Sequence, residues 1–140
     1  MNAKPSSVSR THTFRMLGSR GGIEVVVELR YSRDQPYAVI ATFHASPDSS
    51  VEWDFSRDLL IEGMIAEAGE GDIRIGPADD NLHTIIFELR SPDGYAVLAT
   101  DAGPLAEFLA ASYEMVAVGA EHLAVDVEHE LTALLTNDIY

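Results

Sequence analysis

Residues 23–31, Ile-Glu-Val-Val-Val-Glu-Leu-Arg-Tyr, are the stretch that most clearly indicates the fold. Charged residues fill most of the positions between regularly spaced apolar ones, which are Ile23, Val25, Val27, Leu29 and Tyr31. Because the side chains of a β-strand alternate between its two faces, this period of two predicts a strand with one buried face.

Further strands are predicted on the C-terminal side of this one. Residues 37–44 follow the turn sequence 34–36, and in residues 51–55 acids alternate with Val51, Trp53 and Phe55. We expect Trp53 in the core, with an anchor at a protein interface as the alternative. Residues 83–90 and 95–100 flank Ser-Pro-Asp-Gly at 91–94, in which the proline and the glycine suit a tight hairpin. Two weaker strands are predicted at 11–17 and 72–75, and the glycines Gly18, Gly21 and Gly22 indicate another hairpin turn.

Three segments have apolar residues at helical spacing, each after a residue that can cap a helix N-terminus. The caps are Ser56, Asp101 and Asp126. The stripes are Leu59, Leu60, Met64 and Ile65, then Leu105, Phe108, Leu109 and Tyr113, then Val127, Leu131, Leu134 and Leu135. Because the strands follow one another through short turns while the helices are segregated, we predict an α+β fold with antiparallel sheets. We expect one domain over residues 1–140, with about the first ten residues flexible.

The chain is strongly acidic, with a formal net charge of −14 over 140 residues. Residues 1–34 hold six Lys or Arg against three Asp or Glu, whereas the remainder has only Arg57, Arg74 and Arg90 as cations. Such a surface repels nucleic-acid phosphates and anionic lipids, because affinity for either depends on Lys and Arg. The acidity can simply keep the protein soluble, or it can also discriminate among protein partners.

Several classes of function lack their sequence requirements. No apolar run approaches the roughly 20 residues of a membrane span, and no signal peptide is recognisable, so we expect a cytoplasmic protein. The absence of cysteine excludes disulfides and thiol catalysis. Neither a glycine-rich phosphate loop nor a Gly-x-Ser-x-Gly elbow is present, although a Ser-His-Asp triad stays open because triads are spatial. We therefore predict no enzymatic activity and no cofactor.

A possible metal site is confined to one cluster near the C-terminus, which comprises Glu121, His122, Asp126, Glu128, His129 and Glu130. His129-Glu130 begins like the zinc motif His-Glu-x-x-His, but the position of the second histidine is Ala133. Acids in the first turn of a helix also complement its dipole, and the cluster can equally form a partner contact. We predict no tight metal site here.

The two most specific blocks of the chain are Tyr-Ala-Val-x-Ala-Thr-Phe-His at 37–44 and Trp-x-Phe-x-Arg-Asp-Leu-Leu at 53–60. Shorter segments accompany them in order, at 61–63, 71–74, 91–94, 108–109, 118–122 and 130–131. From about residue 10 to residue 136, this series resembles the SsgA-like proteins, which regulate sporulation and cell division in actinobacteria.

The resemblance implies a fold similar to the Whirly single-stranded nucleic-acid-binding proteins, with bent antiparallel sheets packed against helices, and assembly as a homotrimer. Val26 and Ile40, which lie opposite the main apolar stripe, agree with an oligomer. The resemblance also implies recruitment to the division septum, through binding of the tubulin-like protein FtsZ and of a second SsgA-like protein. Members of similar length include the SsgB-type branch, which recruits FtsZ.

The segment before the last predicted helix departs from the family pattern. The family usually has Val-Pro-x-Gly where this chain has Val-Ala-Val-Gly at 116–119, and a second histidine where it has Ala124. The branch of the family to which this chain is most similar therefore stays open, and so does the question whether this loop binds the same partner as in the family. Our hypothesis is that Gly119, Glu121 and His122 form a partner-binding surface; alternatively, Gly119 only terminates a helix. The alternative for the whole protein is single-stranded nucleic-acid binding, with residues 10–33 as its footprint.

Overall fold

The computed structural model describes residues 6–18, 22–79 and 81–124 of the chain. Eight strands and two helices follow one another in the order β1 (Ser7–Leu17), β2 (Ile23–Ser32), β3 (Ala38–Ser46), β4 (Ser49–Ser56), α1 (Arg57–Gly63), β5 (Ala68–Glu70), β6 (Ile73–Ala78), β7 (Asn81–Ser91), β8 (Gly94–Asp101) and α2 (Ala102–Met115). The strands form one antiparallel sheet in the order β4-β3-β2-β1-β8-β7-β6-β5, which confirms the predicted α+β class.

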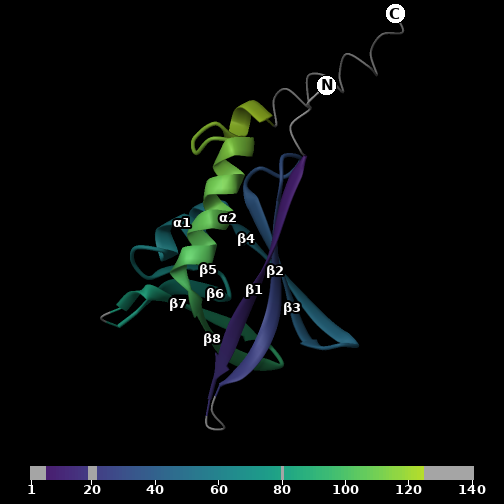
Figure 1. Ribbon diagram of the computed structural model, residues 1–140, viewed down its shortest axis with the longest axis vertical. Helices are drawn as coiled ribbons and strands as arrows, with labels where there is room; N and C mark the ends of the chain where they lie inside the picture. Colours follow the sequence, from purple (N-terminus) through teal and green to yellow (C-terminus); the bar gives the residue numbers. More distant parts are fainter. Residues whose placement is uncertain (1–5, 19–21, 80, 125–140) are drawn as a thin grey trace, which may run out of the picture.

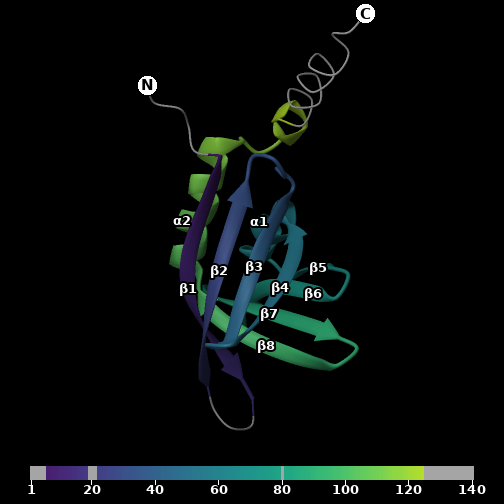
Figure 2. The same ribbon diagram turned by 90° about the vertical axis from the view of Figure 1, so that its right-hand side faces the viewer.

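The sheet is strongly curled, and both helices lie on one side of it. Strands β1–β4 run along the long axis of the molecule, while β5–β8 cross it at a steep angle (Figures 1 and 2). Helix α1 packs against β4, β5 and β6, and α2 contacts β1, β2 and β7. The helices therefore join the two halves of the sheet.

The core follows the alternation of β2. Val25, Val27, Leu29 and Tyr31 are buried as predicted, whereas Ile23, at the first position of the strand, is exposed. Antiparallel partners on both sides, β1 and β3, hold β2 in its register. The predicted β2 strand is thus a central strand of the β1–β4 half.

Aromatic contacts tie the two halves of the sheet together. The ring of Phe14 on β1 lies 5.0 Å from that of Phe87 on β7, and the rings of Phe55 and Phe87 are 6.2 Å apart. Edge-on packing of this kind adds to the burial of apolar area. The predicted β7–β8 hairpin is confirmed, because Ser91 pairs with Gly94 across the turn.

Helix α1 begins as predicted but ends early. The Ser56 side chain accepts a hydrogen bond from the Leu59 N–H at 3.0 Å, and Leu59 and Leu60 are buried. The helix ends at Gly63, where a Cβ would lie only 2.5 Å from the Ile75 side chain. Ile65 therefore falls outside the helical stripe and is 75% exposed, so its predicted burial was wrong.

Other expectations need correction. Strand β1 begins at Ser7 rather than Thr11, so residues 7–10 pair with β2. Trp53 is only half-buried, at the edge of the core, because β4 is the last strand of the sheet. Asp101 precedes α2 but its side chain makes no capping bond. Strand β5 was not predicted, since its sequence Ala-Gly-Glu has no apolar alternation.

Some predictions fall outside the described residues. The third helix with its cap Asp126, the histidine-acid cluster at 126–130 and the tip of the β1–β2 turn are among them. Among the residues that are described, no helix has the length and apolarity needed to cross a membrane.

Candidate functional site

The loop that follows α2 and the helical turn after it, residues 116–124, contain the three residues predicted to bind a partner; this segment is called the loop below. Its backbone turns at Gly119, which has φ +88°, and the Ala120 N–H donates to the Ala117 carbonyl at 2.9 Å. Glycine adopts positive φ without the steric cost that a Cβ brings. No atom within 4 Å would obstruct a Cβ at this position, so the backbone conformation alone requires the glycine. Residues 121–124 are helical again.

Arg57 is the residue that connects this loop to the rest of the domain. It lies at the first position of α1, its N–H donates to the Tyr37 carbonyl at 2.7 Å, and its side chain is fully buried. Nη1 donates to the carbonyl oxygens of Val116 at 2.7 Å and Ser112 at 3.2 Å, and to the Ser112 hydroxyl at 3.2 Å. The last carbonyls of a helix have no intrahelical partner and carry partial negative charge, so a buried cation satisfies them well.

Glu121 supplies the counter-charge for this buried arginine. Its Oε2 accepts a hydrogen bond from Arg57 Nη2 at 2.8 Å, and its Oε1 accepts one from the Gly119 N–H at 2.9 Å. Burial opposes ionisation of the carboxyl, but the hydrogen bonds and charge of Arg57 outweigh it and hold the pKa of Glu121 below its ordinary value. The carboxylate therefore links the turn at Gly119 to the core.

Two tyrosines complete the environment of the guanidinium. Its central carbon lies 4.6 Å from the ring centre of Tyr31 and 5.5 Å from that of Tyr113. Burial raises the pKa of Tyr31 to about 12, and its hydroxyl donates to the Pro36 carbonyl at 2.8 Å. Stacking combined with several hydrogen bonds is a role that the planar guanidinium fills and a lysine ammonium does not.

The structure brings the three predicted site residues together but gives them different positions. Gly119 and His122 are exposed, whereas Glu121 is only 6% exposed and faces Arg57 rather than solvent. In this structure Glu121 anchors the loop, so Gly119 and His122 are the two residues of the predicted partner-binding surface that face solvent. Sequence reasoning missed Arg57: its block, Phe-Ser-Arg-Asp-Leu-Leu, was recognised as specific, but no local pattern connects residue 57 with residue 121.

The outer surface of the anchored loop is apolar. Val118 is 56% exposed and Leu123 is 55% exposed, and in the sequence they come before and after the exposed His122. We call Val118, His122 and Leu123 the loop patch. Within residues 6–18, 22–79 and 81–124, no group of three or more His, Asp or Glu side chains is placed to hold a metal ion. The arrangement therefore offers an exposed apolar contact on a rigid base.

Comparison with known proteins connects this chain to proteins of sporulation. A family model described as "Streptomyces sporulation and cell division protein, SsgA" matches residues 25–121. The chain is 47% identical over 117 residues to the sporulation-specific cell division protein SsgB of Saccharopolyspora erythraea, covering 84% of this chain and 83% of that protein. It is 38% identical over 125 residues to SsgB of Streptomyces coelicolor, covering 89% of this chain and 91% of that protein.

Two solved structures share the fold. The SsgA-like sporulation-specific cell division protein from Thermobifida fusca superposes with a TM-score of 0.84 and 37% identity, over 94% of this chain and 98% of that one. A second structure comes from work on SsgB mutations that correlate with longitudinal cell division during sporulation of Streptomyces coelicolor. It superposes with a TM-score of 0.80 and 36% identity, over 89% of this chain and 99% of that one.

Proposed function

This chain belongs to the SsgA family of sporulation and cell division proteins, and from that premise we propose that it is a non-enzymatic regulator that positions septa by binding division proteins. The proposed partners are the tubulin-like division protein FtsZ and a second SsgA-like protein. Recruitment to the division septum would then follow from these contacts.

The observation that carries the proposal is the loop patch on its buried anchor. Val118 and Leu123 expose apolar surface that nothing in the described part of the chain covers. Exposed apolar surface supported by a rigid scaffold is typical of a protein contact. The Arg57–Glu121 pair holds the loop from beneath, so the patch needs little ordering when a partner binds.

Co-sedimentation with polymerised FtsZ tests this proposal. We expect Val118→Ser and Leu123→Ser to reduce the amount of protein that sediments with the polymer, because each removes an apolar contact at the patch. Leu82→Ser on β7 is the matched control, since Leu82 is also exposed, at 64%, but lies outside the loop. Equal co-sedimentation of all three variants and the parent protein would exclude the loop as the FtsZ contact.

A labelled single-stranded oligonucleotide, titrated at low salt in parallel, addresses the alternative function. The net charge of −14 disfavours such binding. Tight, salt-sensitive binding of the oligonucleotide together with no binding to FtsZ would replace the proposed function by nucleic-acid binding.

We also propose that the protein is a homo-oligomer, with the trimer of the family resemblance as the expected state. An apolar groove of about 420 Å³ lies where Ile23, Val51 and Tyr95 leave the core partly uncovered, and Val26 is exposed on the opposite face of β2. Light scattering at micromolar concentration measures the mass directly. We expect Ile23→Asp to lower it and Leu82→Asp to leave it unchanged; a monomeric parent protein would contradict the proposal.

A further inference from the structure

Strand β1 lies in the middle of the sheet order, yet half of it has an open edge. It pairs with β2 from Ser7 to Met16, whereas β8 pairs only with Arg15–Leu17. The two halves of the curled sheet diverge beyond that point (Figure 2). Within the described residues, no strand pairs with residues 7–14 on the side away from β2.

The backbone groups that face this open edge follow from the register. The Ser6 carbonyl accepts the Arg33 N–H at 2.9 Å, so even-numbered residues of β1 direct their backbone groups to β2. Odd-numbered residues direct theirs outward, and accordingly the Thr13 carbonyl accepts the Thr100 hydroxyl at 3.0 Å. Ser7, Ser9 and Thr11 therefore present their N–H and C=O groups at an unpaired strand edge. Proteins normally cover or disrupt such an edge because it pairs readily with another chain.

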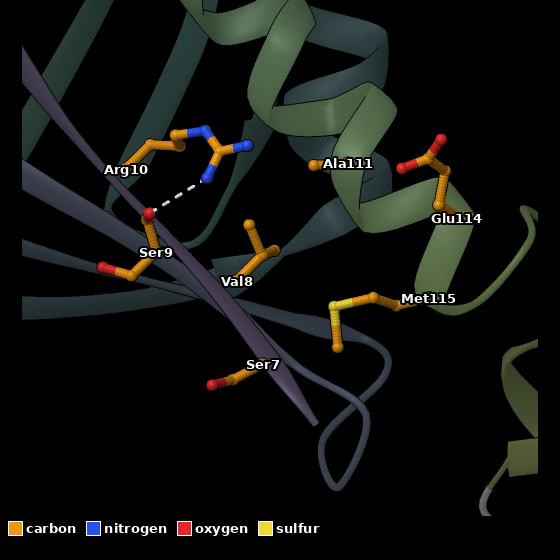
Figure 3. Close-up of a pocket in the computed structure, with 7 residues that line it drawn as sticks. All are labelled: Ser7, Val8, Ser9, Arg10, Ala111, Glu114 and Met115. Carbon is orange, nitrogen blue, oxygen red and sulfur yellow. Dashed lines mark hydrogen bonds between the residues drawn. The ribbon is translucent and has the colours of Figure 1, made fainter. Parts of the chain in front are cut away.

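A groove of about 700 Å³ lies between this edge and α2. Figure 3 shows Val8 and Met115 directed into it from opposite walls, and the Arg10 guanidinium beside the edge. One guanidinium nitrogen of Arg10 donates to the Ser9 carbonyl at 3.4 Å, an exposed and long contact that an incoming N–H can replace. The groove thus combines a strand template, an apolar wall and two opposite charges, with Arg10 beside the strand edge and Glu114 on the α2 side (Figure 3).

We propose that this groove binds an extended, acidic segment of another protein, which adds to β1 as a strand. Main-chain hydrogen bonds to Ser7, Ser9 and Thr11 would supply affinity, as in other cases of strand addition. On the face that meets α2, an apolar side chain lies against Val8 and Met115. Two residues along the segment, a carboxylate lies against Arg10, because side chains two apart share one face.

The Arg10 guanidinium favours a carboxylate at the strand edge rather than beside Glu114, and it distinguishes the occupant from this chain's own β1. Arg10 forms no ion pair with any described residue, although the molecule as a whole carries a net charge of −14. If two copies paired antiparallel through this edge about Ser9 or Thr11, both Arg10 side chains would lie at diagonal positions of one face, where like charges repel. The site goes beyond the proposed function, because it uses none of the loop patch residues.

Fluorescence anisotropy with a labelled peptide, acetyl-Gly-Ser-Val-Thr-Glu-Thr-Val-Ser, tests this site on the full chain. Proline at residue 9 removes an outward N–H and spares the β1–β2 ladder, so we expect Ser9→Pro to weaken binding at least about tenfold. Ser9→Thr is the matched control and should bind like the parent protein. Circular dichroism reports whether both variants are folded.

Two further arms separate strand addition from simple charge attraction. We expect Arg10→Glu to weaken binding of the acidic peptide about tenfold. The same variant should instead bind a version of the peptide that has lysine in place of glutamate. A peptide with N-methylated backbone amides keeps its charge but cannot pair, so it should not bind. Equal binding of the N-methylated peptide, or no binding of the first peptide, would overturn the proposal. So would a Ser9 amide that is already protected from hydrogen exchange in the free protein.

Discussion

Two Arg–Glu pairs are present among the described residues, and they lie in opposite environments. Arg57 and Glu121 are 1% and 9% exposed at their side chains, whereas Arg74 and Glu67, on the β5–β6 side, are 57% and 63% exposed. The buried pair joins residues 64 positions apart and also satisfies the end of α2; the exposed pair joins neighbours 7 apart. An Arg–Glu ion pair thus holds a loop in place at one site and lies on the exposed surface at the other.

The largest expected difference between the two pairs is in stability. Arg57→Met leaves the buried Glu121 carboxylate without its counter-charge and the Val116 carbonyl without its bond from Nη1, and such losses cost about 3–5 kcal/mol. We expect the free energy of unfolding, from urea titration followed by circular dichroism, to fall by that order. Arg74→Met is the matched variant. It should leave the midpoint of the urea titration unchanged, because exposed ion pairs contribute little to stability.

Arg57→Lys refines this comparison. Lysine keeps the charge but cannot donate to Ser112, Val116 and Glu121 while stacking on the tyrosines. We expect its stability to lie between those of the parent protein and Arg57→Met. Equal stability of the lysine variant and the parent protein would show that charge alone matters here.

Glu121→Gln tests the carboxylate side of the buried pair. The neutral amide weakens the contact with Arg57, and we expect a loss of about 1–3 kcal/mol at neutral pH. Because folding lowers the pKa of Glu121, its contribution is complete above the unfolded value of about 4.5 and is lost as the pH falls through the folded value. Stability of the parent protein should therefore fall more steeply in acid than that of Glu121→Gln. Parallel pH profiles would contradict this role.

The turn that Glu121 anchors allows a comparison of two glycines with open surroundings. Gly119 has φ +88°, whereas Gly103 lies in the first turn of α2, and a Cβ meets no atom within 4 Å at either. We expect Gly119→Ala to destabilise the protein by about 1–2 kcal/mol through left-handed strain. Gly103→Ala should stabilise it by about 0.5–1 kcal/mol, because alanine favours a helix. Thermal unfolding measures both; a shift of the same sign would contradict the assigned backbone conformations.

Local patterns explain which parts of the fold were predictable. The stripe of β2, the β7–β8 hairpin and the Ser56 cap depend on residues a few positions apart, and all three are confirmed. Strand β5 has no pattern of its own; it pairs with β6, and its Glu70 side chain accepts the Ser56 N–H at 2.9 Å. Tertiary contacts, rather than propensity, create it.

The candidate site was predictable only in part for the same reason. Gly119 has positive φ just after the end of α2, and glycine near a helix end is a local signal for such a turn. The role of Glu121 was not predictable, because it depends on Arg57 far away in the sequence. The sequence shows that most Lys and Arg residues lie in residues 1–34. Only the strand register shows that Arg10 lies at an open strand edge.

The smallest expected effect concerns a buried polar group that, unlike Arg57, lacks a counter-charge. His12 on β1 is 4% exposed, its ring lies 6.3 Å from that of Phe108, and its Nδ1 has no hydrogen-bond partner among the described residues. Burial lowers the pKa of His12 below its ordinary 6.5. The unfolded chain therefore takes up this proton first as the pH falls below that value, and stability falls with it.

Urea titrations of the parent protein and His12→Leu at pH 8 and pH 5.5 measure this loss. Leucine cannot take up the proton, so we expect the variant to lose less stability than the parent protein between the two conditions. His122→Leu is the matched substitution at an exposed position of the loop. If His12→Leu and the parent protein lost equal stability, burial of the His12 imidazole would not be a source of acid sensitivity.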